Sequence, residues 1–596
     1  MFALALTAGK SRESSRRFHR WLSQMDPSGA LCPIRFEETF SWGWMGVAGA
    51  GQSVVLRQDD QRQFVVVSGQ VLDKAVYQAL TDAAGPWQAG MRLAETTGQF
   101  VFAKGSETAS APLVVGTDNL GMRPLFWNGE KKEFSIANHS TLCGLLAGRL
   151  ELDESYVLDL TLKDAVLPWQ SLLKGVRRVQ RGRYLQLEAG RMHELPVRHF
   201  HDLSARHVSR AQAIESLCLA TQSLAGHPQD YFLGLTGGRD SRLIMAMLLA
   251  EKIAFESGTH AMPCPDGQIA QQLADKAGVT HYGISRANQG VMTGVVKYLR
   301  WLPWSEGTMP LHTVDAPVTV HDMAAQRGMI HLGGLGGEVA RSYWDQPEAD
   351  FQTPEHVLQA RFFRPYQNDF YLNARRLSQS REDWNSLLRH EGIDDPFVGT
   401  HIAYLDARLR GTLVLRTNCA WFDYAWPMAN SEFYAYAWRL PRRERQQAAI
   451  FEDFIRELSP ELLSVPWAAG NAGVYTAGQN WMQRAKGRLK QSRSANVLRG
   501  RFRLLQGQSP TFRKSEILLR AFFRDREAHA WLRETYGTKG VERLETCSST
   551  YINEAQRSLT LYLMAHVVHC LQAASEAESF WDLPWLQAAL KLAQSA

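Results

Sequence analysis

The chain has 596 residues, of which 45% are hydrophobic and 21% are charged, and its formal net charge is +6. This length and composition predict a soluble globular protein of about two to four domains. Seven scattered cysteines without Cys-x-x-Cys spacing argue against a zinc site or a disulfide framework, and the longest apolar runs are too short to cross a membrane. The N-terminus has no basic region ahead of a long apolar one, so no secretory signal is expected. We therefore predict a cytoplasmic protein with no integral membrane segment.

The first 200 or so residues are predicted to be rich in β-strands. Short apolar runs bounded by turn residues indicate three of these strands, at 64–70, 100–103 and 113–116. Helical patterns intervene around 76–83 and 156–162.

The most informative segment is 231–242, Tyr-Phe-Leu-Gly-Leu-Thr-Gly-Gly-Arg-Asp-Ser-Arg. Its apolar start predicts a short buried parallel strand, and the periodicity after Asp240 predicts a helix that begins there. The glycine pair between them lets the backbone approach a ligand closely. Free N–H groups and the helix dipole would favour an anion at this junction.

Strands and helices alternate after this junction. A second strand is predicted at 254–259 and a third at 328–332, with helical stretches between them. Such alternation predicts a parallel sheet with helices on both faces. Beyond Pro354 the chain is predicted to be almost wholly helical.

A basic stretch that contains no acidic residue lies at 484–514. It favours an acidic or leader-peptide partner, or an anionic membrane surface; the alternative is a solvated helix pair packed on an acidic neighbour. No nucleic-acid-binding signature accompanies it, so no nucleic-acid partner is expected.

Several segments resemble one known family. Residues 236–241, Thr-Gly-Gly-Arg-Asp-Ser, are similar to the pyrophosphate loop Ser-Gly-Gly-x-Asp-Ser of the ATP pyrophosphatases. Residues 118–126, Asp-Asn-Leu-Gly-Met-Arg-Pro-Leu-Phe, resemble a family segment Asp-Pro-Leu-Gly-Ile-Arg-Pro-Leu-Tyr. Further similar segments lie at 173–182, 265–281 and 416–441. The order of these segments is similar to that in the asparagine synthetase family.

The resemblance implies an α/β protein in three parts. Residues 1–200 would form a degenerate glutaminase-like domain with the αββα sandwich of the Ntn hydrolases. Residues 205–475 would form an adenine-nucleotide α-hydrolase-like synthetase domain around a parallel sheet. A basic, mostly helical C-terminal extension would occupy 476–596.

The N-terminal part departs from the family at the glutaminase site. Phe2 stands where the family has its N-terminal Cys nucleophile, and the first cysteine is Cys32. Residues 68–70, Ser-Gly-Gln, replace Asn-Gly-Glu, and 42–46 occupy the place of an arginine-rich pocket motif. We therefore expect no glutamine hydrolysis. In this the chain resembles β-lactam synthetase and the lasso-peptide cyclases, which join an activated carboxylate to an amine of the substrate.

The resemblance also implies roles for the loop. The β- and γ-phosphates of ATP would be held by four loop residues, Thr236, Gly237, Gly238 and Ser241. Asp240 would bind Mg²⁺, which takes hard oxygen ligands together with phosphates and waters.

A second acidic motif of the family aligns with 333–338. The metal-binding Asp of that motif is Gly337 here, whereas Glu338 is kept. We expect Glu338 to supply the second carboxylate; the alternative is a first-turn carboxylate that interacts with a helix dipole.

Other candidate residues carry weaker signals. The family's late lysine on pyrophosphate has no clear counterpart, and Arg239 or Arg242 would replace it unless both are surface residues. His260 and His312 lie near predicted strand ends, as structural residues or facing the substrate. Four tryptophans either line an acceptor pocket or belong to the core, namely Trp301, Trp304, Trp421 and Trp426.

Two classes of function follow. The first is an ATP-dependent ligase that adenylates a carboxylate, releases pyrophosphate and AMP, and forms an amide with an amine; ammonia-dependent asparagine synthesis is a variant of it. The second is an inactive relative that serves as a scaffold or binding protein, suggested by the changes at Gly334, Gly337 and the late lysine.

Overall fold

The computed structural model describes the chain in stretches. These are residues 2–8, 12–25, 32–38, 42–48, 54–58, 63–71, 98–106, 113–130, 133–188, 191–197, 207–226, 230–262, 265–285, 291–311, 319–345, 351–363, 370–371, 374–389, 395–417, 424–468, 512–546, 552–572 and 583–595.

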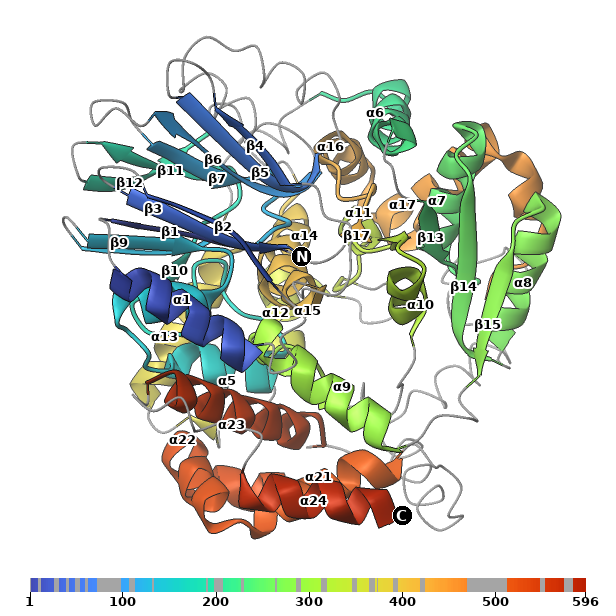
Figure 1. Ribbon diagram of the computed structural model, residues 1–596. Coiled ribbons are helices and arrows are strands. Elements are labelled where there is room, and N and C mark those ends of the chain that lie inside the picture. The colour runs from blue at the N-terminus through green and yellow to red at the C-terminus, as the bar shows by residue number, and fades with distance from the viewer. Residues whose placement is uncertain are drawn as a thin grey trace.

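Two antiparallel six-stranded sheets stack face to face in the N-terminal part (Figure 1). The first has the order β10-β8-β9-β1-β3-β2 and consists of β1 (Phe2–Ala8), β2 (Cys32–Glu38), β3 (Trp42–Ala48), β8 (Phe126–Glu130), β9 (Glu133–Ala137) and β10 (Arg177–Arg178). The second has the order β12-β11-β7-β6-β5-β4 and consists of β4 (Val54–Gln58), β5 (Gln63–Val71), β6 (Gly98–Ser106), β7 (Leu113–Thr117), β11 (Arg183–Glu188) and β12 (Arg191–Pro196). The three strands predicted from sequence are β5, β6 and β7.

Apolar residues on both faces of these strands build the core. On β6, Val101 and Ala103 belong to one buried cluster with Ile136 of the other sheet, whereas Phe100 and Phe102 join a second cluster. Neighbouring residues of a strand point to opposite faces, so β6 is covered on both sides.

Helices cover the outer face of the first sheet (Figure 1). They include α1 (Arg12–Met25), α4 (Ser140–Ala147) and α5 (Glu154–Lys163). The helix predicted at 156–162 is α5, with Asp153 as its N-cap. The helix predicted at 76–83 lies outside the described residues. Two sheets and one helical layer of the expected sandwich are therefore seen.

A five-stranded, all-parallel sheet forms the centre of the next part. Its order is β15-β14-β13-β16-β17, with β13 (Tyr231–Gly234), β14 (Phe255–Met262), β15 (His281–Ser285), β16 (Ile330–Leu332) and β17 (Tyr424–Ala425). The predicted α/β class is confirmed. The sequence prediction missed β15, and β16 begins two residues later than expected because Gly328 turns the chain with a φ of 67°.

The strand order fixes where a ligand would bind. From β13 the chain moves outward to β14 and β15, then returns to the other side of β13 as β16. The crevice between such strands, at their carboxyl ends, is the usual ligand site of an open parallel sheet. The loops after β13 and β16 meet at this point.

The remaining described elements are almost all helical. Between residues 207 and 468 they are α6 (Arg210–Gln222), η2 (Ser223–Gly226), α7 (Arg239–Ala250), α8 (Pro265–Ala277), α9 (Val291–Trp304), α10 (Val320–Gln326), α11 (Gly337–Ala340), α12 (Pro354–Phe362), α13 (Ala374–Ser386), α14 (Val398–Ala403), the π-helix η6 (Tyr404–Leu413), α15 (Val414–Thr417), α16 (Ser431–Arg439), α17 (Arg442–Gln447), α18 (Ala449–Leu458) and η7 (Pro460–Ser464). Near the C-terminus they are α21 (Phe512–Arg524), α22 (Arg526–Glu545), α23 (Ile552–Gln572) and α24 (Pro584–Ser595).

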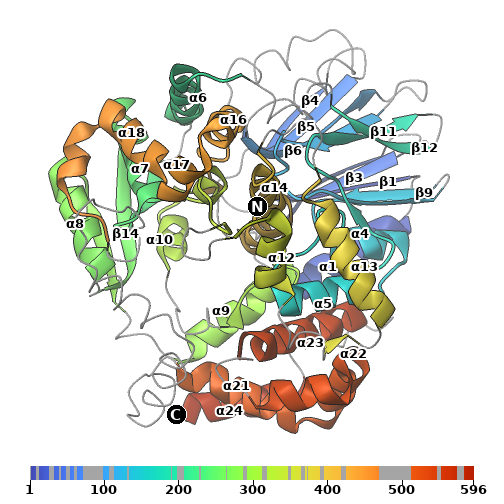
Figure 2. The ribbon, with the colours of Figure 1, turned by 180° about the vertical axis from the view of Figure 1, so that it is seen from behind.

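The C-terminal helices lie against the N-terminal part of the chain, below α1 and α5 in Figure 1 and again from behind in Figure 2. Arg20 of α1 donates a hydrogen bond to the carbonyl of Cys570 of α23 at 2.9 Å. None of the described helices combines the length and apolarity that crossing a bilayer would require.

Buried hydrogen bonds join the sandwich to the parallel sheet. The amide side chain of Gln99 donates to the carbonyl of Trp426 at 3.2 Å and accepts from the N–H of Trp426 at 3.1 Å. Arg410 of η6 donates to the carbonyl of Gly121, where an added side chain would meet its guanidinium. The segment 118–126, recognised by its motif, therefore serves as a docking turn.

Candidate active site

The loop after β13 keeps its shape through two hydroxyl groups. The N–H of Thr236 donates to Ser241 Oγ, and the N–H of Gly238 donates to Thr236 Oγ1, both at 3.1 Å. The two hydroxyl oxygens lie 3.1 Å apart. Helix α7 then begins at Arg239, with Gly238 as its N-cap. Thr236 thus joins the start of the loop to the first turn of the helix through its contacts with Gly238 and Ser241.

One loop N–H already binds an oxyanion. Gly237 N donates to Asp266 Oδ1 at 2.8 Å, from the first turn of α8. Ala468 covers the same glycine and donates its N–H to the Gly237 carbonyl at 3.2 Å. A side chain at 237 would come within 2.9 Å of Asp266 Oδ1 and 2.8 Å of Ala468 Cβ, so this close approach requires glycine.

Asp240 lies at the centre of the site. Its Oδ2 accepts a hydrogen bond from Arg341 Nη2 at 2.7 Å, whereas its buried Oδ1 has no partner among the described residues. Burial raises the pKa of Asp240 to about 7, with a further contribution from Glu338, while Arg341 and Arg239 oppose the rise. The carboxylate therefore keeps one buried oxygen whose hydrogen-bonding capacity is unused among the described residues.

The loop after β16 reaches Asp240 through its glycines. A side chain at Gly334 would come within 2.8 Å of Asp240 Cβ, and one at Gly337 would overlap Asp240 Oδ1. Gly336 has a φ of 102°, in the left-handed region. Asp240 thus packs closely on the bare backbone of Gly337, the position where the resemblance predicts an Asp.

Glu338 lies in the first turn of α11, as the alternative interpretation expected, and its role as a metal ligand stays a prediction. Its Oε2 accepts a hydrogen bond from Gly336 N at 3.2 Å, in the first turn of α11, and its charge raises the pKa of Asp240. The described residues contain no group of three or more His, Cys, Asp or Glu side chains that could hold a metal ion. The orphaned Asp240 Oδ1 fits Mg²⁺ if phosphates and waters supply the other ligands.

Arg239 and Arg242 are buried, so the interpretation of both as surface residues is wrong. Arg242 stacks on Trp467 at 3.8 Å and donates to the carbonyls of Val465 and Pro466. Its guanidinium therefore fixes the segment 465–468, which covers the loop. Arg239 keeps a buried Nη2 without a partner among the described residues, which makes it the better candidate for a phosphate contact.

The described contacts join none of the other candidates to Asp240. His260 is exposed near the end of β14. Trp301, Trp304 and Trp426 are buried core residues, as one of the two interpretations held. His312 and Trp421 lie outside the described residues, as do the side chains of 484–514.

Three participants were missed in the sequence. Asp266 lies inside the similar segment 265–281 but was not singled out as a site residue, and Ala468 carries no sequence signal. Arg341 stands three residues after Glu338, so a search for cations around the second acidic motif would have found it.

The segment 68–70, where the resemblance predicts a degenerate glutaminase site, contains a glycine with a positive φ. Gly69 has a φ of 117°, and a side chain there would overlap the carbonyl oxygen of Gln99. Phe2 begins β1, which lies inside the first sheet between β3 and β9. The loss of glutamine hydrolysis stays a prediction.

No family model matches the chain, and no curated protein does. Among solved structures, the allosteric regulatory enzyme of purine biosynthesis matches with 12% identity and a TM-score of 0.22, over 39% of this chain and 60% of its own. The glutamine phosphoribosylpyrophosphate amidotransferase from B. subtilis matches with 11% identity and the same TM-score of 0.22, over 48% of this chain and 90% of its own. The chain thus spans less than two thirds of the first. Likenesses this slight carry no argument about fold or function.

Proposed function

We propose that the protein is an ATP-dependent amide-forming ligase related to the asparagine synthetases, and that it works without glutamine. The observation that carries the proposal is the loop at the carboxyl end of β13, whose Gly237 N–H holds a carboxylate oxygen beside the N-terminus of α7. A backbone that binds one oxyanion can bind another, and α7 adds the positive end of its dipole.

The residues have separate tasks in the reaction. A substrate carboxylate oxygen attacks the α-phosphorus of ATP, pyrophosphate leaves, and the amine then displaces AMP from the acyl-adenylate. Asp266 gives up Gly237 N to the phosphates, and Arg239 offers its unpartnered nitrogen to the departing pyrophosphate. Mg²⁺, held by Asp240 and Glu338, would neutralise charge on the phosphates. The cover at 465–468 excludes water from the activated acid.

The amine is proposed to belong to the substrate. Phe2 has no nucleophile to release ammonia from glutamine. Incubation with glutamine, with and without ATP, is expected to release no more glutamate than a blank without enzyme. Release above that blank would contradict the loss of the glutaminase.

A scaffold without catalysis is the second candidate. The ion pair between Asp240 and Arg341 favours it, because the arginine occupies one oxygen of the proposed metal ligand. The two candidates differ in whether ATP displaces these internal partners.

ATP–pyrophosphate exchange with a panel of carboxylic acids separates the candidates. We expect exchange from the unaltered protein and none from Asp240→Asn. Arg327→Gln serves as the control, because Arg327 forms a half-exposed ion pair with Glu256 away from the loop. Absence of both ATP binding and exchange across the panel would favour the scaffold.

A further inference from the structure

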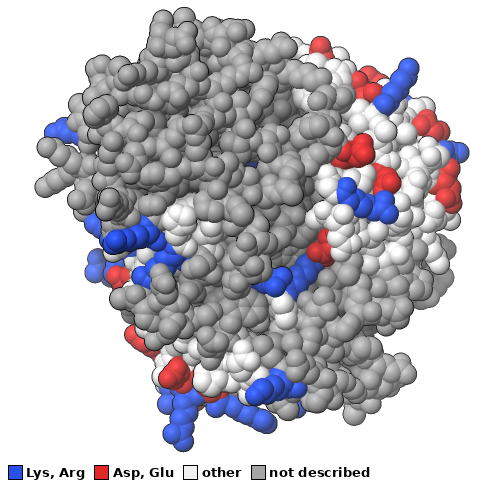
Figure 3. Space-filling model, viewed as in Figure 1, with Lys and Arg blue, Asp and Glu red and all other residues white. Residues whose placement is uncertain are grey.

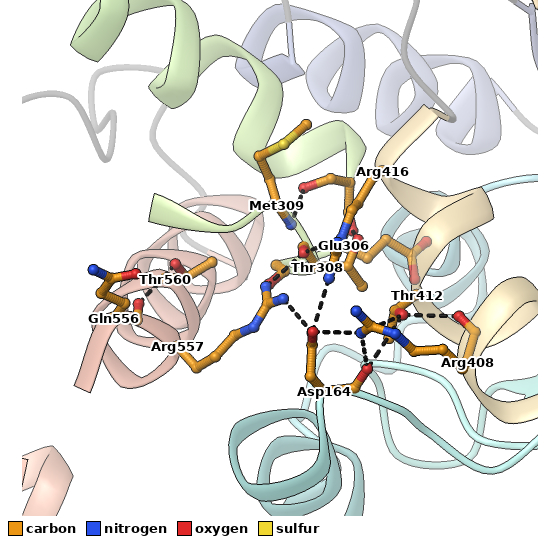
Figure 4. A network of polar contacts seen from close by, with 12 residues as sticks. Asp164, Glu306, Thr308, Met309, Arg408, Thr412, Arg416, Gln556, Arg557 and Thr560 are labelled. Carbon is orange, nitrogen blue, oxygen red and sulfur yellow. Dashed lines mark hydrogen bonds and ion pairs between the residues drawn. The ribbon is translucent and has the colours of Figure 1, made fainter. Parts of the chain in front are cut away.

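A second polar cavity lies away from the loop, where the three parts of the chain meet. Its volume is about 380 Å³, and its walls come from the end of α5, from η6 and α15, and from α23 (Figure 4). This size suits a small-molecule ligand. No role assigned above uses it.

Three arginines surround one carboxylate in this cavity. Arg416 Nη2 lies 2.8 Å from Asp164 Oδ1, Arg557 contacts the same oxygen, and Arg408 contacts Oδ2. Asp164 ends α5 in the left-handed conformation, with a φ of 51°. We define these four residues as the arginine cluster.

The arginine cluster carries an excess of positive charge. One carboxylate faces three guanidinium groups, and Arg361 adds a fourth to the wall, against Glu554 as the other acidic lining residue. Burial lowers the pKa of Arg416 to about 9, and Arg557 and Arg408 act in the same direction, against Asp164. A further anion would relieve this repulsion.

The guanidinium groups are held in place from behind. Arg416 Nε donates to the carbonyl of Thr308 at 2.9 Å, and Arg557 donates to the same carbonyl. The described contacts leave Arg416 Nη1, Arg408 Nη2 and Arg557 Nε without an acceptor. Prepositioned donors with spare N–H groups are what recognition of an oxyanion requires.

The concentration of charge is a property of the cavity. On the face drawn in Figure 3, basic and acidic side chains of the described residues lie interspersed. The net charge of +6 is small for 596 residues, so general surface charge does not account for the cluster.

We propose that the arginine cluster binds a small molecule through an oxyanion group, a phosphate or a carboxylate. Such a ligand would bridge α23 to η6 and α5, and would give the C-terminal helices a binding role that is separate from the loop.

The test is binding of inorganic phosphate and of citrate, by calorimetry and thermal unfolding, at constant ionic strength set with sodium chloride. Glycerol serves as the neutral control. We expect phosphate or citrate to bind and to raise the melting temperature, and the comparison of the two identifies the preferred group. Arg408→Gln should bind about tenfold more weakly, as expected for the loss of one charge-assisted hydrogen bond.

Asp164→Asn provides the reverse test, because asparagine tolerates the left-handed backbone while the competing anion is removed. This variant should be less stable alone, but should bind the anion more tightly and gain more stability from it. Arg327→Gln should bind like the unaltered protein, because Arg327 lies away from the cavity in an ion pair with Glu256. Equal anion effects in Asp164→Asn, Arg408→Gln and the surface control Arg327→Gln would overturn the proposal, as would the same effect from sodium chloride alone.

Discussion

The loop after β13 and the arginine cluster each contain an aspartate bound to arginine, yet the two carboxylates behave oppositely. Asp240 has one arginine, an unpartnered oxygen and a pKa raised to about 7 by burial. Asp164 has three arginines, and they hold its pKa well below the usual range against the effect of burial. The comparison teaches that the number of facing cations decides whether a buried carboxylate is open to a new partner or already saturated.

The largest expected effect comes from closing the space beside Asp240. In Gly337→Ala the new methyl group would overlap Asp240 Oδ1 and force it away from the position it holds. We expect ATP–pyrophosphate exchange to fall by at least about a hundredfold, and stability by about 1–3 kcal/mol. Gly129→Ala is the matched control, since a side chain there would meet only ordinary contacts at 3.6 Å. Equal exchange rates in the two variants would show that Asp240 has no part in it.

The next largest effect is expected from removing the carboxylate of the arginine cluster. Asp164→Asn leaves three arginines without their shared carboxylate, but Asp164 is 39% exposed and solvent screens part of the charge. We expect the free energy of unfolding to fall by about 1–3 kcal/mol at neutral pH, measured by chemical denaturation. A variant as stable as the parent would mean that these ion pairs make no net contribution to the free energy of unfolding.

A third carboxylate sharpens the comparison through pH. Glu306 is buried near the cluster, its Oε1 accepts the N–H of Ser140, and burial raises its pKa to about 7. Because the native state then binds the proton more tightly than the unfolded chain, Glu306 loses stabilising effect as the pH rises from about 4.5 to about 7.

Asp164 has the opposite linkage. Its pKa is lowered on folding, so its contribution is complete above the unfolded value of 3.8 and is lost only as the pH falls below it. Between pH 5 and 7.5, the stability of Glu306→Gln relative to the parent should therefore rise, whereas that of Asp164→Asn should stay constant. Denaturation midpoints at a series of pH values measure both, and parallel profiles would contradict the assigned causes.

The smallest effect is expected at the surface. Arg327→Gln breaks a half-exposed ion pair with Glu256 and the contacts of Arg327 with Tyr282, so its unfolding free energy should change by only about 0.5–1 kcal/mol. A larger loss of stability would indicate that exposed ion pairs contribute more to the free energy of unfolding of this protein than expected.

The features predicted from the sequence are those that depend on residues close together in the chain. The strand, glycine turn and helix around Asp240 depend on neighbouring residues, and so do the strands β5, β6 and β7. The short strand β15, with a glycine and polar residues, was missed because its pattern is weak.

What the sequence did not show comes from long-range contacts. Asp266 and Ala468 meet Gly237 only in the folded chain, and the cluster joins residues 164, 408 and 557. The sequence left Arg242 as either a phosphate contact or a surface residue, because its partners, the carbonyls at 462–466, lie more than two hundred positions away. The spacing of residues within a motif carries no information about contacts with residues far away in the sequence.

The two hydrogen bonds between the Gln99 side chain and the Trp426 backbone have a consequence for folding during synthesis. The partner backbone emerges from the ribosome 327 residues after Gln99, so until then the Gln99 amide and the edge around it are exposed to water. A fragment that ends near residue 200 would keep that edge permanently, together with the carbonyl of Gly121 that Arg410 caps. Such a fragment should aggregate or require a chaperone, whereas a longer chain that includes β17 should not.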